Sequence, residues 1–404
     1  MADALRALPA RRIVAHVADA ARRWSDADFP PRVRVTVEIE RRLGYSTPVV
    51  EYALDRLFFA FRAVELEAAI GAELGSVEAL DGVVERHGLP AAWARGVERV
   101  AIVSSDSTIG VAVVPAVFAL CAKCDVVVKD RSDALVAAFF SSLAEEHPAF
   151  AAAASARPWT GGDDPDEDAL FAGADVVVAF GGDDALRAIR TRCGIETRYV
   201  PFGHRASIGR LARADLAALD DALADRIVRD ALLYDGEGCL SLHALFVGAA
   251  GSDLARVATS LAAACERVAL EFPAGARDAL PTARTAAYRN LAVFRAAGGS
   301  GAVLRGADAT LVIDPPAEDA LPFLPRVLPV YGGDDDAIVR YVERQRLPVQ
   351  ALGVVAADAD AVTLAARIGA VRVAPFGSMQ SPPASGHHGG AARITDFVRW
   401  IDTA

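Results

Sequence analysis

Cys239 is the residue best suited to covalent chemistry. It lies in Gly236-Glu237-Gly238-Cys239-Leu240-Ser241, between an expected helix and an expected strand. Two preceding glycines leave a thiol accessible and next to free backbone N–H groups, which can lower a thiol pKa and stabilise an oxyanion. The alternative is a small buried apolar residue, the common role of cysteine. The pattern therefore predicts either a nucleophile or a core position.

His243 follows Cys239 by four residues. If this segment is a strand, the two side chains share a face but lie about 13 Å apart, at roughly 3.3 Å per residue. That distance excludes direct deprotonation of the thiol by this imidazole. A core or hydrogen-bonded histidine is the alternative role.

Lys129 is a candidate cofactor ligand. It ends the apolar run Val126–Val128, and only one other lysine, Lys123, occurs among 42 basic residues. In open α/β sheets, ligands bind beyond the carboxyl ends of the strands, where a lysine can contact a ribose hydroxyl or a phosphate. The alternative is a solvated charge at the end of a strand.

Gly181, Gly182 and Asp183 follow an expected strand and begin an expected helix. Backbone N–H groups at such a helix start favour phosphate. The segment does not match GxGxxG, and no such motif follows the first expected strand, which is followed instead by Ser104 and Ser105. The glycines therefore indicate a nucleotide site only in general terms.

Cys121 and Cys124 form Cys-Ala-Lys-Cys at an expected helix end. A zinc site needs a second suitably spaced pair, and a thioredoxin-like pair would begin a helix. The remaining candidates, His387 and His388, are adjacent rather than spaced as ligands. We therefore expect no metal site.

Two regions of alternating strands and helices carry these candidates. Residues 1–95 predict helices, and from residue 96 apolar β-branched runs alternate with helical patterns, which is typical of a parallel sheet covered on both faces. We expect strands at 99–103, 125–128, 175–180, 197–202, 242–247, 303–304, 310–313, 327–331 and 351–356, and helices at 109–123, 132–146, 212–233, 253–270, 334–346 and 394–403.

Length and composition exclude several classes of protein. The 404 residues suggest two or three domains, and 53% hydrophobic residues exclude general disorder. A net charge of −11 argues against a nucleic-acid partner. The longest apolar run, 109–122, is shorter than the ~20 residues that span a bilayer, and residues 1–23 lack a secretory apolar core. Five cysteines form no disulfide framework. We expect a cytoplasmic protein without a membrane span.

Taken together, these segments resemble the aldehyde dehydrogenase superfamily, and within it the acyl-CoA reductase family that includes the fatty acid reductase of bacterial bioluminescence. The resemblance follows the order of motifs through Val-Val-Val-Lys129, Phe180-Gly181-Gly182-Asp183, Gly238-Cys239-Leu240-Ser241 and Arg326-Val327-Leu328-Pro329-Val330. Its most specific part is the ending Pro375-Phe376-Gly377-Ser378-Met379-Gln380-Ser381, then His387-His388-Gly389-Gly390. The likeness is best over 95–404.

The resemblance implies an α/β fold with a Rossmann-type dinucleotide-binding domain and an α/β catalytic domain. We expect a helical lead-in at 1–95, a cofactor domain at 96–228, a catalytic thiol domain at 229–375 and a C-terminal crossover segment and helix at 376–404. It also implies that Cys239 holds the acyl group as a thioester and that Lys129 contacts the adenosine ribose or its 2′-phosphate. Ser104, Ser105, Gly181, Gly182 and Asp183 would lie near the cofactor, with His204 or His243 supplying a proton.

Three departures refine the expected chemistry. Val200-Pro201-Phe202-Gly203-His204 stands where hydrolytic relatives carry a base glutamate. The superfamily's oxyanion-hole asparagine is absent from the loop 104–108, and Pro322-Phe323-Leu324-Pro325-Arg326 replaces its usual ribose contact. Without a base to activate water, a thioester would persist until it is reduced or passed to another thiol.

The resemblance therefore implies NADPH-dependent reduction of acyl-CoA or an acyl-carrier protein to an aldehyde. The alternatives are an NAD(P)-dependent aldehyde dehydrogenase, an acyl-phosphate reductase, or a non-catalytic partner subunit that retains the fold. A homo-oligomer and an acyl-activating or carrier partner protein are further expectations from the family.

Overall fold

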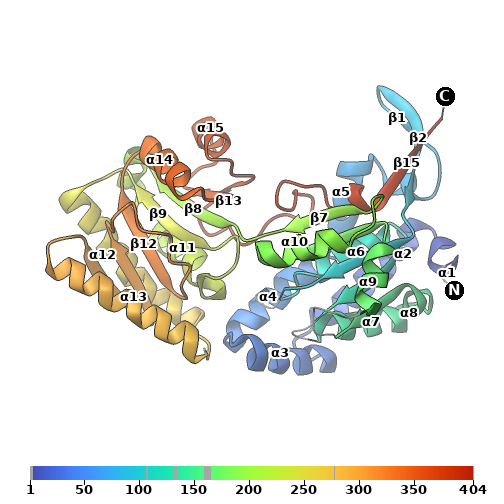
Figure 1. Cartoon of the computed structure of the whole chain (residues 1–404), viewed down its shortest axis with the longest axis horizontal. Helices are drawn as coiled ribbons and strands as arrows, with labels where there is room; N and C mark the ends of the chain where they lie inside the picture. Colours follow the sequence, from blue (N-terminus) through green and yellow to red (C-terminus); the bar gives the residue numbers. More distant parts are fainter. Residues whose placement is uncertain (1–2, 106–107, 131–133, 159–164, 277, 404) are drawn as a thin grey trace. The chain divides into compact units, whose positions relative to one another are not determined.

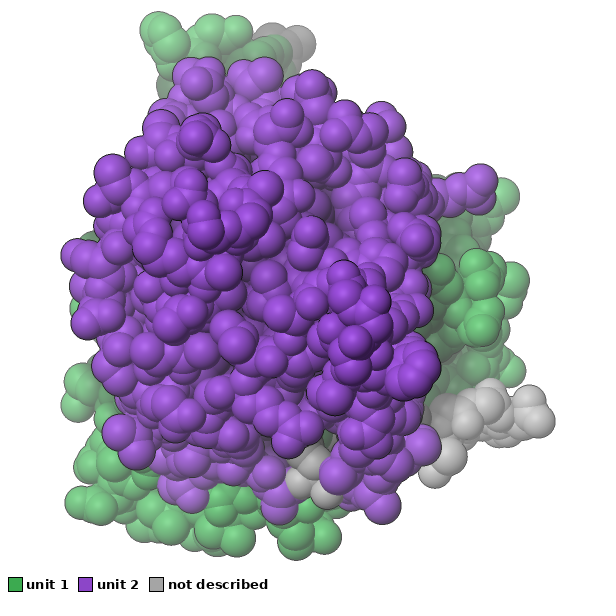
Figure 2. Space-filling model, turned by 90° about the vertical axis from the view of Figure 1, so that its left-hand side faces the viewer, with its two compact units in different colours: residues 1–43, 50–203, 383–404 green, residues 44–49, 204–382 purple. Residues whose placement is uncertain are grey.

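The computed structural model describes residues 3–105, 108–130, 134–158, 165–276 and 278–403, which form two compact units. Unit 1 comprises residues 1–43, 50–203 and 383–404, and unit 2 comprises residues 44–49 and 204–382 (Figure 2). The units divide at 203/204, earlier than the expected 228/229, because the strand at 206–211 pairs into the sheet of unit 2. Parts of two expected elements, Asp106 and Ser107 of the loop and Ser132 and Asp133 of the helix, lie outside the described residues.

A parallel sheet of five strands forms the centre of unit 1 (Figure 1). Its order is β5-β4-β3-β6-β7, so the chain builds outward from β3 on one side and then on the other. The topological switch point therefore lies between β3 and β6. The strands are β3 (Arg99–Val103), β4 (Asp125–Lys129), β5 (Ala154–Arg157), β6 (Val176–Phe180) and β7 (Arg198–Phe202).

Helices of unit 1 bury an aromatic cluster. The Trp24 ring stacks on Phe58 and meets Phe139 edge-on, and its Nε1–H donates to Ser142 Oγ at 3.0 Å, so the buried indole is satisfied. The helical segments here are α1 (Asp3–Arg6), α2 (Ala10–Trp24), α3 (Pro30–Leu43), α4 (Thr47–Phe59), α5 (Ala63–Leu74), η1 (Val77–Leu80), α6 (Val113–Cys121), α7 (Leu135–Glu146), α8 (Ala149–Ala153), α9 (Pro165–Ala172) and α10 (Asp183–Arg192).

A small antiparallel sheet corrects two predictions. The expected helix at 394–403 is a short 3-10 turn, η4 (Thr395–Phe397), followed by β15 (Val398–Asp402). The end of the expected helical lead-in likewise forms β1 (Val84–Arg86) and β2 (Leu89–Gly96). β15 pairs with β2 along its whole length, so long-range backbone hydrogen bonds override the local helical pattern.

Unit 2 contains a seven-stranded sheet in the order β10-β11-β12-β9-β8-β13-β14. β10 is antiparallel to β11, and the other pairs are parallel. The continuous apolar runs of its central strands suit burial on both faces. The strands are β8 (Ala206–Leu211), β9 (Leu242–Val247), β10 (Ala302–Gly306), β11 (Ala309–Ile313), β12 (Val327–Gly332), β13 (Val349–Val354) and β14 (Val373–Pro375).

Helices cover both faces of this sheet (Figure 1). Ile338 and Leu364, from the helices α14 and α15, pack with Phe246 and Tyr331 in the core of one face. α11, α12 and α13 lie on the other face. The expected helix at 212–233 is interrupted into two segments, and α13 was not anticipated from the sequence. The helical segments are η2 (Arg213–Ala218), α11 (Asp221–Leu232), η3 (Leu233–Gly236), α12 (Gly251–Glu271), α13 (Ala279–Ala297), α14 (Asp335–Gln345) and α15 (Ala359–Arg367).

Candidate functional site

Cys239 lies on a short turn between η3 and β9 in unit 2. The Ser241 N–H donates to the Gly238 carbonyl at 2.8 Å and closes the turn. The Ser207 hydroxyl, on β8, donates to the Cys239 carbonyl at 2.7 Å. The backbone at Cys239 is thus held by the neighbouring strand while the residue itself is exposed. Of the two roles left open by the sequence, this position fits the accessible thiol.

The chain reaches this turn through left-handed backbone. Tyr234 and Asp235 have φ of 54° and 52°, and Gly236 has φ of 74°. Left-handed backbone costs a non-glycine residue roughly 1–2 kcal/mol. The buried Asp235 carboxylate accepts from Arg326 Nε at 2.7 Å, and its carbonyl accepts from the Arg326 N–H at 2.9 Å. This ion pair therefore holds the strained approach to the thiol.

Opposing interactions act on the Cys239 thiol. Loss of solvation raises the pKa of Cys239 above its ordinary value, whereas the backbone N–H groups of Cys239 and Leu240 and the charge of Arg205 lower it. Loss of solvation is the largest of these effects, so the pKa of the thiol lies above its ordinary value. Arg205 was not singled out from the sequence, since a lone arginine in a loop carries no pattern.

The two histidines differ in their surroundings. His243 is buried on β9, where burial lowers its pKa to about 4, and its Nδ1 accepts from the Ser207 N–H at 3.1 Å. It is therefore a neutral imidazole with one nitrogen already engaged, as the hydrogen-bonded alternative anticipated. His204 is exposed in the loop before β8.

The cofactor candidates lie at the carboxyl edge of the sheet in unit 1. Ser104 and Ser105 follow β3, and Gly181 and Gly182 follow β6, so the two segments flank the switch point between these strands. Gly182 is the N-cap of α10 and supplies no side-chain cap to it. Backbone N–H groups at this helix start are suited to oxygen ligands.

Lys129 is buried at the end of β4, at the same carboxyl edge of the sheet. Its Nζ lies 2.6 Å from Glu167 Oε1 on α9, and Arg192 Nη1 from α10 lies 2.8 Å from Glu167 Oε2. The Glu167 carboxylate thus joins two cations. Lys129 is therefore not a solvated charge at the end of a strand, because its ammonium is buried and paired with a buried carboxylate.

The segment 200–204, where the resemblance implies that no base glutamate is present, carries an aromatic stack. The Phe202 ring lies 4.9 Å from Phe180 and 4.2 Å from the imidazole of His388. Burial lowers the pKa of His388 to about 4, so it is neutral at pH 7. The Asp183 carboxylate lies beside this segment, since its Oδ1 is 3.5 Å from where a Cβ on Gly203 would be.

The crossover segment 376–382 is fastened to α11 in unit 2. The Asp230 carboxylate accepts from the Gly377 N–H at 2.6 Å. Burial raises the pKa of Asp230 to about 7, although the N–H groups of Gly377 and Met379 and the charges of Arg229 and Arg372 oppose the shift. The sequence gives no sign of this contact, because a buried aspartate inside a helix has no local pattern.

Asp230 makes unfolding pH-dependent. The unfolded carboxyl titrates near pH 4, so between about pH 4 and 7 the folded state holds a proton that the unfolded state has released. We therefore expect this group's contribution to the unfolding free energy to decrease as the pH rises through that window. Urea titrations of the wild type and Asp230→Asn at pH 5 and pH 8 measure it. The unfolding free energy should differ less between pH 5 and pH 8 in Asp230→Asn than in the wild type. An equally large difference in the variant would contradict the assignment.

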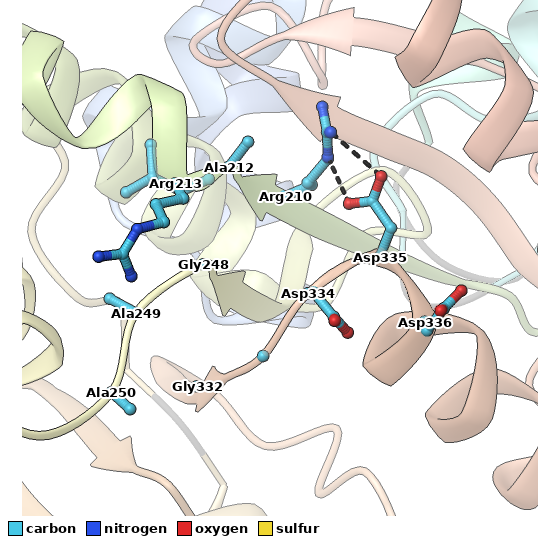
Figure 3. A pocket seen from close by; sticks show the side chains of 12 residues that line it. Arg210, Ala212, Arg213, Gly248, Ala249, Ala250, Gly332, Asp334, Asp335 and Asp336 are labelled. Carbon is cyan, nitrogen blue, oxygen red and sulfur yellow. Dashed lines mark hydrogen bonds and ion pairs between the residues drawn. The ribbon is translucent and has the colours of Figure 1, made fainter.

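A pocket of about 680 Å³ lies at the carboxyl ends of β8, β9 and β12 (Figure 3). Arg210 and Asp335 pair within it at 2.6 and 3.1 Å, and Arg213 extends over Ala249. Cys239 precedes β9, whereas the pocket follows that strand of six residues, so the two lie at opposite edges of the sheet, roughly 20 Å apart. The pocket is therefore separate from the thiol.

Neither a membrane helix nor a metal cluster is found in the described residues. None of their helices is long and apolar enough to cross a bilayer, and no three of their His, Cys, Asp and Glu side chains are grouped as metal ligands. Cys121 and Cys124 are buried, and burial raises the pKa of Cys121 to about 12.

Comparisons with known proteins give a family and a fold. The family model described as acyl-CoA reductase (LuxC) matches residues 5–400. A search of curated proteins found no significant match.

Solved structures, aldehyde dehydrogenases among them, share the fold at low identity. Aldehyde dehydrogenase 21 from Physcomitrella patens, in complex with the reaction product succinate, is 14% identical with a TM-score of 0.74, over 99% of this chain and 87% of that one. An NAD-dependent benzaldehyde dehydrogenase from Corynebacterium glutamicum is 16% identical with a TM-score of 0.71, also over 99% and 87%. An NADP-dependent enzyme from E. coli is 16% identical with a TM-score of 0.68, over 99% and 86%. The expected aldehyde dehydrogenase-like α/β fold is confirmed.

Proposed function

Since this chain belongs to the acyl-CoA reductase (LuxC) family, we propose that it reduces an acyl thioester to an aldehyde with NADPH. It is an oxidoreductase of the acyl-CoA reductase and aldehyde dehydrogenase type. The observation that carries the finer proposal is the exposed Cys239 on a braced turn next to backbone N–H groups. The acyl donor is acyl-CoA or an acyl-carrier protein.

Cys239 performs the first step. Its thiolate attacks the thioester carbonyl, the bond from carbon to the carrier sulfur breaks, and the carrier leaves as its thiolate and takes a proton. The acyl group is then held on Sγ as a new thioester. The N–H groups of Cys239 and Leu240, which lie beside Sγ, are the proposed donors to the developing oxyanion, in place of the missing asparagine.

A nicotinamide cofactor, when bound, would supply hydride to the acyl carbon; the bond from that carbon to Sγ would then break, which releases the aldehyde and returns Cys239 as a thiolate. Residues 200–204 carry no carboxylate to activate water, which favours reduction over hydrolysis of the acyl-enzyme. His204 and His243 remain the proposed proton donors. His204 is the better suited of the two, because it is exposed, whereas His243 is buried with Nδ1 engaged.

The carboxyl edge of unit 1 fits a dinucleotide. Gly182 is the N-cap of α10 and supplies no side-chain cap, and we assign its neighbouring N–H groups, with Ser104 and Ser105, to the pyrophosphate. Asp183 lies in the first turn of α10, where its negative charge disfavours phosphate. The pyrophosphate is therefore assigned to backbone N–H donors and not to an attractive net charge. Lys129, directed by Glu167, is assigned to the adenosine ribose or its 2′-phosphate.

Lys129→Arg is expected to weaken NADPH binding about tenfold, equivalent to one charge-assisted hydrogen bond of ~1.4 kcal/mol. A planar guanidinium cannot keep the point contact that the ammonium makes beside Glu167. Fluorescence titration with NADPH measures the Kd without turnover. Lys123→Arg is the matched control, because that lysine pairs with Asp81 at 2.5 Å in unit 1. Equal affinities in the two variants would remove Lys129 from the cofactor site.

NADPH oxidation across an acyl-CoA chain-length series, with the product identified as aldehyde, tests the reaction. An aldehyde dehydrogenase, the second candidate, would reduce NAD(P)⁺ with an aldehyde and release acid; the Asp183 carboxylate beside Gly203 is the observation in its favour. Turnover of an acyl phosphate alone would indicate the phosphate-ester reductase. No NADPH binding and no acylation would indicate a non-catalytic partner subunit.

Assembly is a further part of the proposal. A homo-oligomer and an acyl-activating or carrier partner protein are expected from the family alone. Sedimentation of the purified protein, with and without an acyl-carrier protein, tests both.

A further inference from the structure

Gln380 connects the crossover segment to both sides of the Cys239 turn. Its Nε2 donates to the Asp230 and Leu233 carbonyls at 2.9 and 3.2 Å, and its Oε1 accepts from the Ser241 hydroxyl at 3.3 Å. We propose that Gln380 is a positioning residue that holds the Cys239 turn in its reactive conformation. The inference rests on the proposed function only in taking Cys239 as the nucleophile.

The contacts of Gln380 lie on either side of the strained backbone. Asp230 and Leu233 are at the end of α11, where helix carbonyls lack intrahelical partners, and Ser241 begins β9. The left-handed residues between them persist only if their surroundings fix both ends. One side-chain amide thus fixes the entrance and the exit of the nucleophile turn.

Burial makes this connection hard to replace by water. Ser241 has no exposed surface, and Gln380 is 9% exposed. Gly238 packs directly against the pair, since a Cβ there would lie 3.2 Å from Ser241 Oγ and 3.5 Å from Gln380 Oε1. Removing the amide leaves two carbonyls and a hydroxyl without this partner, and the turn can relax toward the vacated space.

Ser207 acts on the same turn from the opposite strand. Its hydroxyl donates to the Cys239 carbonyl and accepts from the Ala351 N–H at 3.1 Å, and its N–H donates to His243. Gln380 fixes the residues that flank Cys239, and Ser207 fixes Cys239 itself. The thiol is therefore directed by groups that do not touch the substrate in the proposed reaction.

The test is the pH dependence of Cys239 alkylation in Gln380→Ala. Iodoacetamide labelling is followed by mass spectrometry of the peptide that contains Cys239, so the other cysteines do not interfere. We expect the apparent pKa of the thiol to rise, because Sγ moves away from the Cys239 and Leu240 N–H groups. Acylation of Cys239 by acyl-CoA should fall about 100-fold, as for a displacement of roughly 1 Å.

Gln345→Ala is the matched control. Gln345 is the last residue of α14, and its Nε2 also donates to two carbonyls of unit 2, those of Ala317 and Asp319. A general loss of stability would affect both variants, whereas a changed alkylation profile only in Gln380→Ala supports positioning. If Gln380→Ala does not fold, Ser241→Ala removes the exit contact alone and should shift the profile in the same direction.

The proposal would be overturned if Gln380→Ala and Ser241→Ala, or whichever of them folds, showed the same alkylation profile as the wild type. Failure of the proposed function gives a different result. A wild-type protein whose Cys239 is alkylated but never acylated by acyl-CoA would refute the reductase reaction and leave the alkylation comparison intact.

Discussion

Cys239→Ala is expected to lower acyl-CoA-dependent NADPH oxidation by at least about 1000-fold, because loss of a nucleophile removes the covalent route altogether. The substitution removes one sulfur from an exposed position and leaves the backbone contact from Ser207 in place. Folding should therefore be preserved. NADPH oxidation is followed by absorbance, and the acyl-enzyme is measured by covalent retention of a radiolabelled acyl group.

Cys193→Ala is the control for this experiment. Cys193 is the other cysteine that is not buried, and it lies at the end of α10 in unit 1. This variant should keep both the labelled acyl group and NADPH oxidation. Unchanged NADPH consumption in Cys239→Ala would reject the nucleophile assignment, and label retained on another residue would identify its replacement.

Arg326→Met is expected to lower the unfolding free energy of unit 2 by about 3–5 kcal/mol, the cost of leaving one member of a buried ion pair uncompensated. The Arg326 guanidinium is 3% exposed and binds Asp235 and Asp308 and the Phe272 carbonyl. Without it, the buried Asp235 carboxylate loses its cation. The strained backbone before Cys239 loses its support as well, so the acylation rate should fall together with stability.

Urea denaturation measures the stability change, and Arg256→Met is the control. Arg256 pairs with Asp253 on the surface of unit 2, with more than half of each side chain exposed, and such pairs contribute about 0–1 kcal/mol. The double variant Asp235→Asn/Arg326→Met removes the unpaired charge and should recover part of the loss. A change in Arg326→Met as small as that in Arg256→Met would show that the buried pair does not support this turn.

The sequence predicted those elements that have strong local patterns. The apolar runs at 99–103, 125–128 and 175–180 became β3, β4 and β6, because fully buried strands need continuous apolar residues. Elements defined by pairing were misassigned or missed. β15 is a strand because β2 accepts it along one edge, and β8 joins unit 2 because β9 and β13 flank it.

The candidate site divides in the same way. The accessible position of Cys239 after two glycines and the strand-end position of Lys129 follow from local sequence, since each depends on where one element ends and the next begins. The partner of Lys129 does not, because Glu167 belongs to a helix 38 residues later and reaches the lysine only when β4 and α9 pack together.

By itself, the sequence determined the family, the α/β class and the candidate nucleophile, because motif order and apolar periodicity are properties of the chain. The tertiary structure alone decided what holds that nucleophile. Arg326, Ser207 and Gln380 come from segments far from Cys239 in sequence, and they meet its turn because strands and a crossover segment fold onto one another. Their hydrogen bonds depend on buried distances of about 3 Å, which no local pattern encodes.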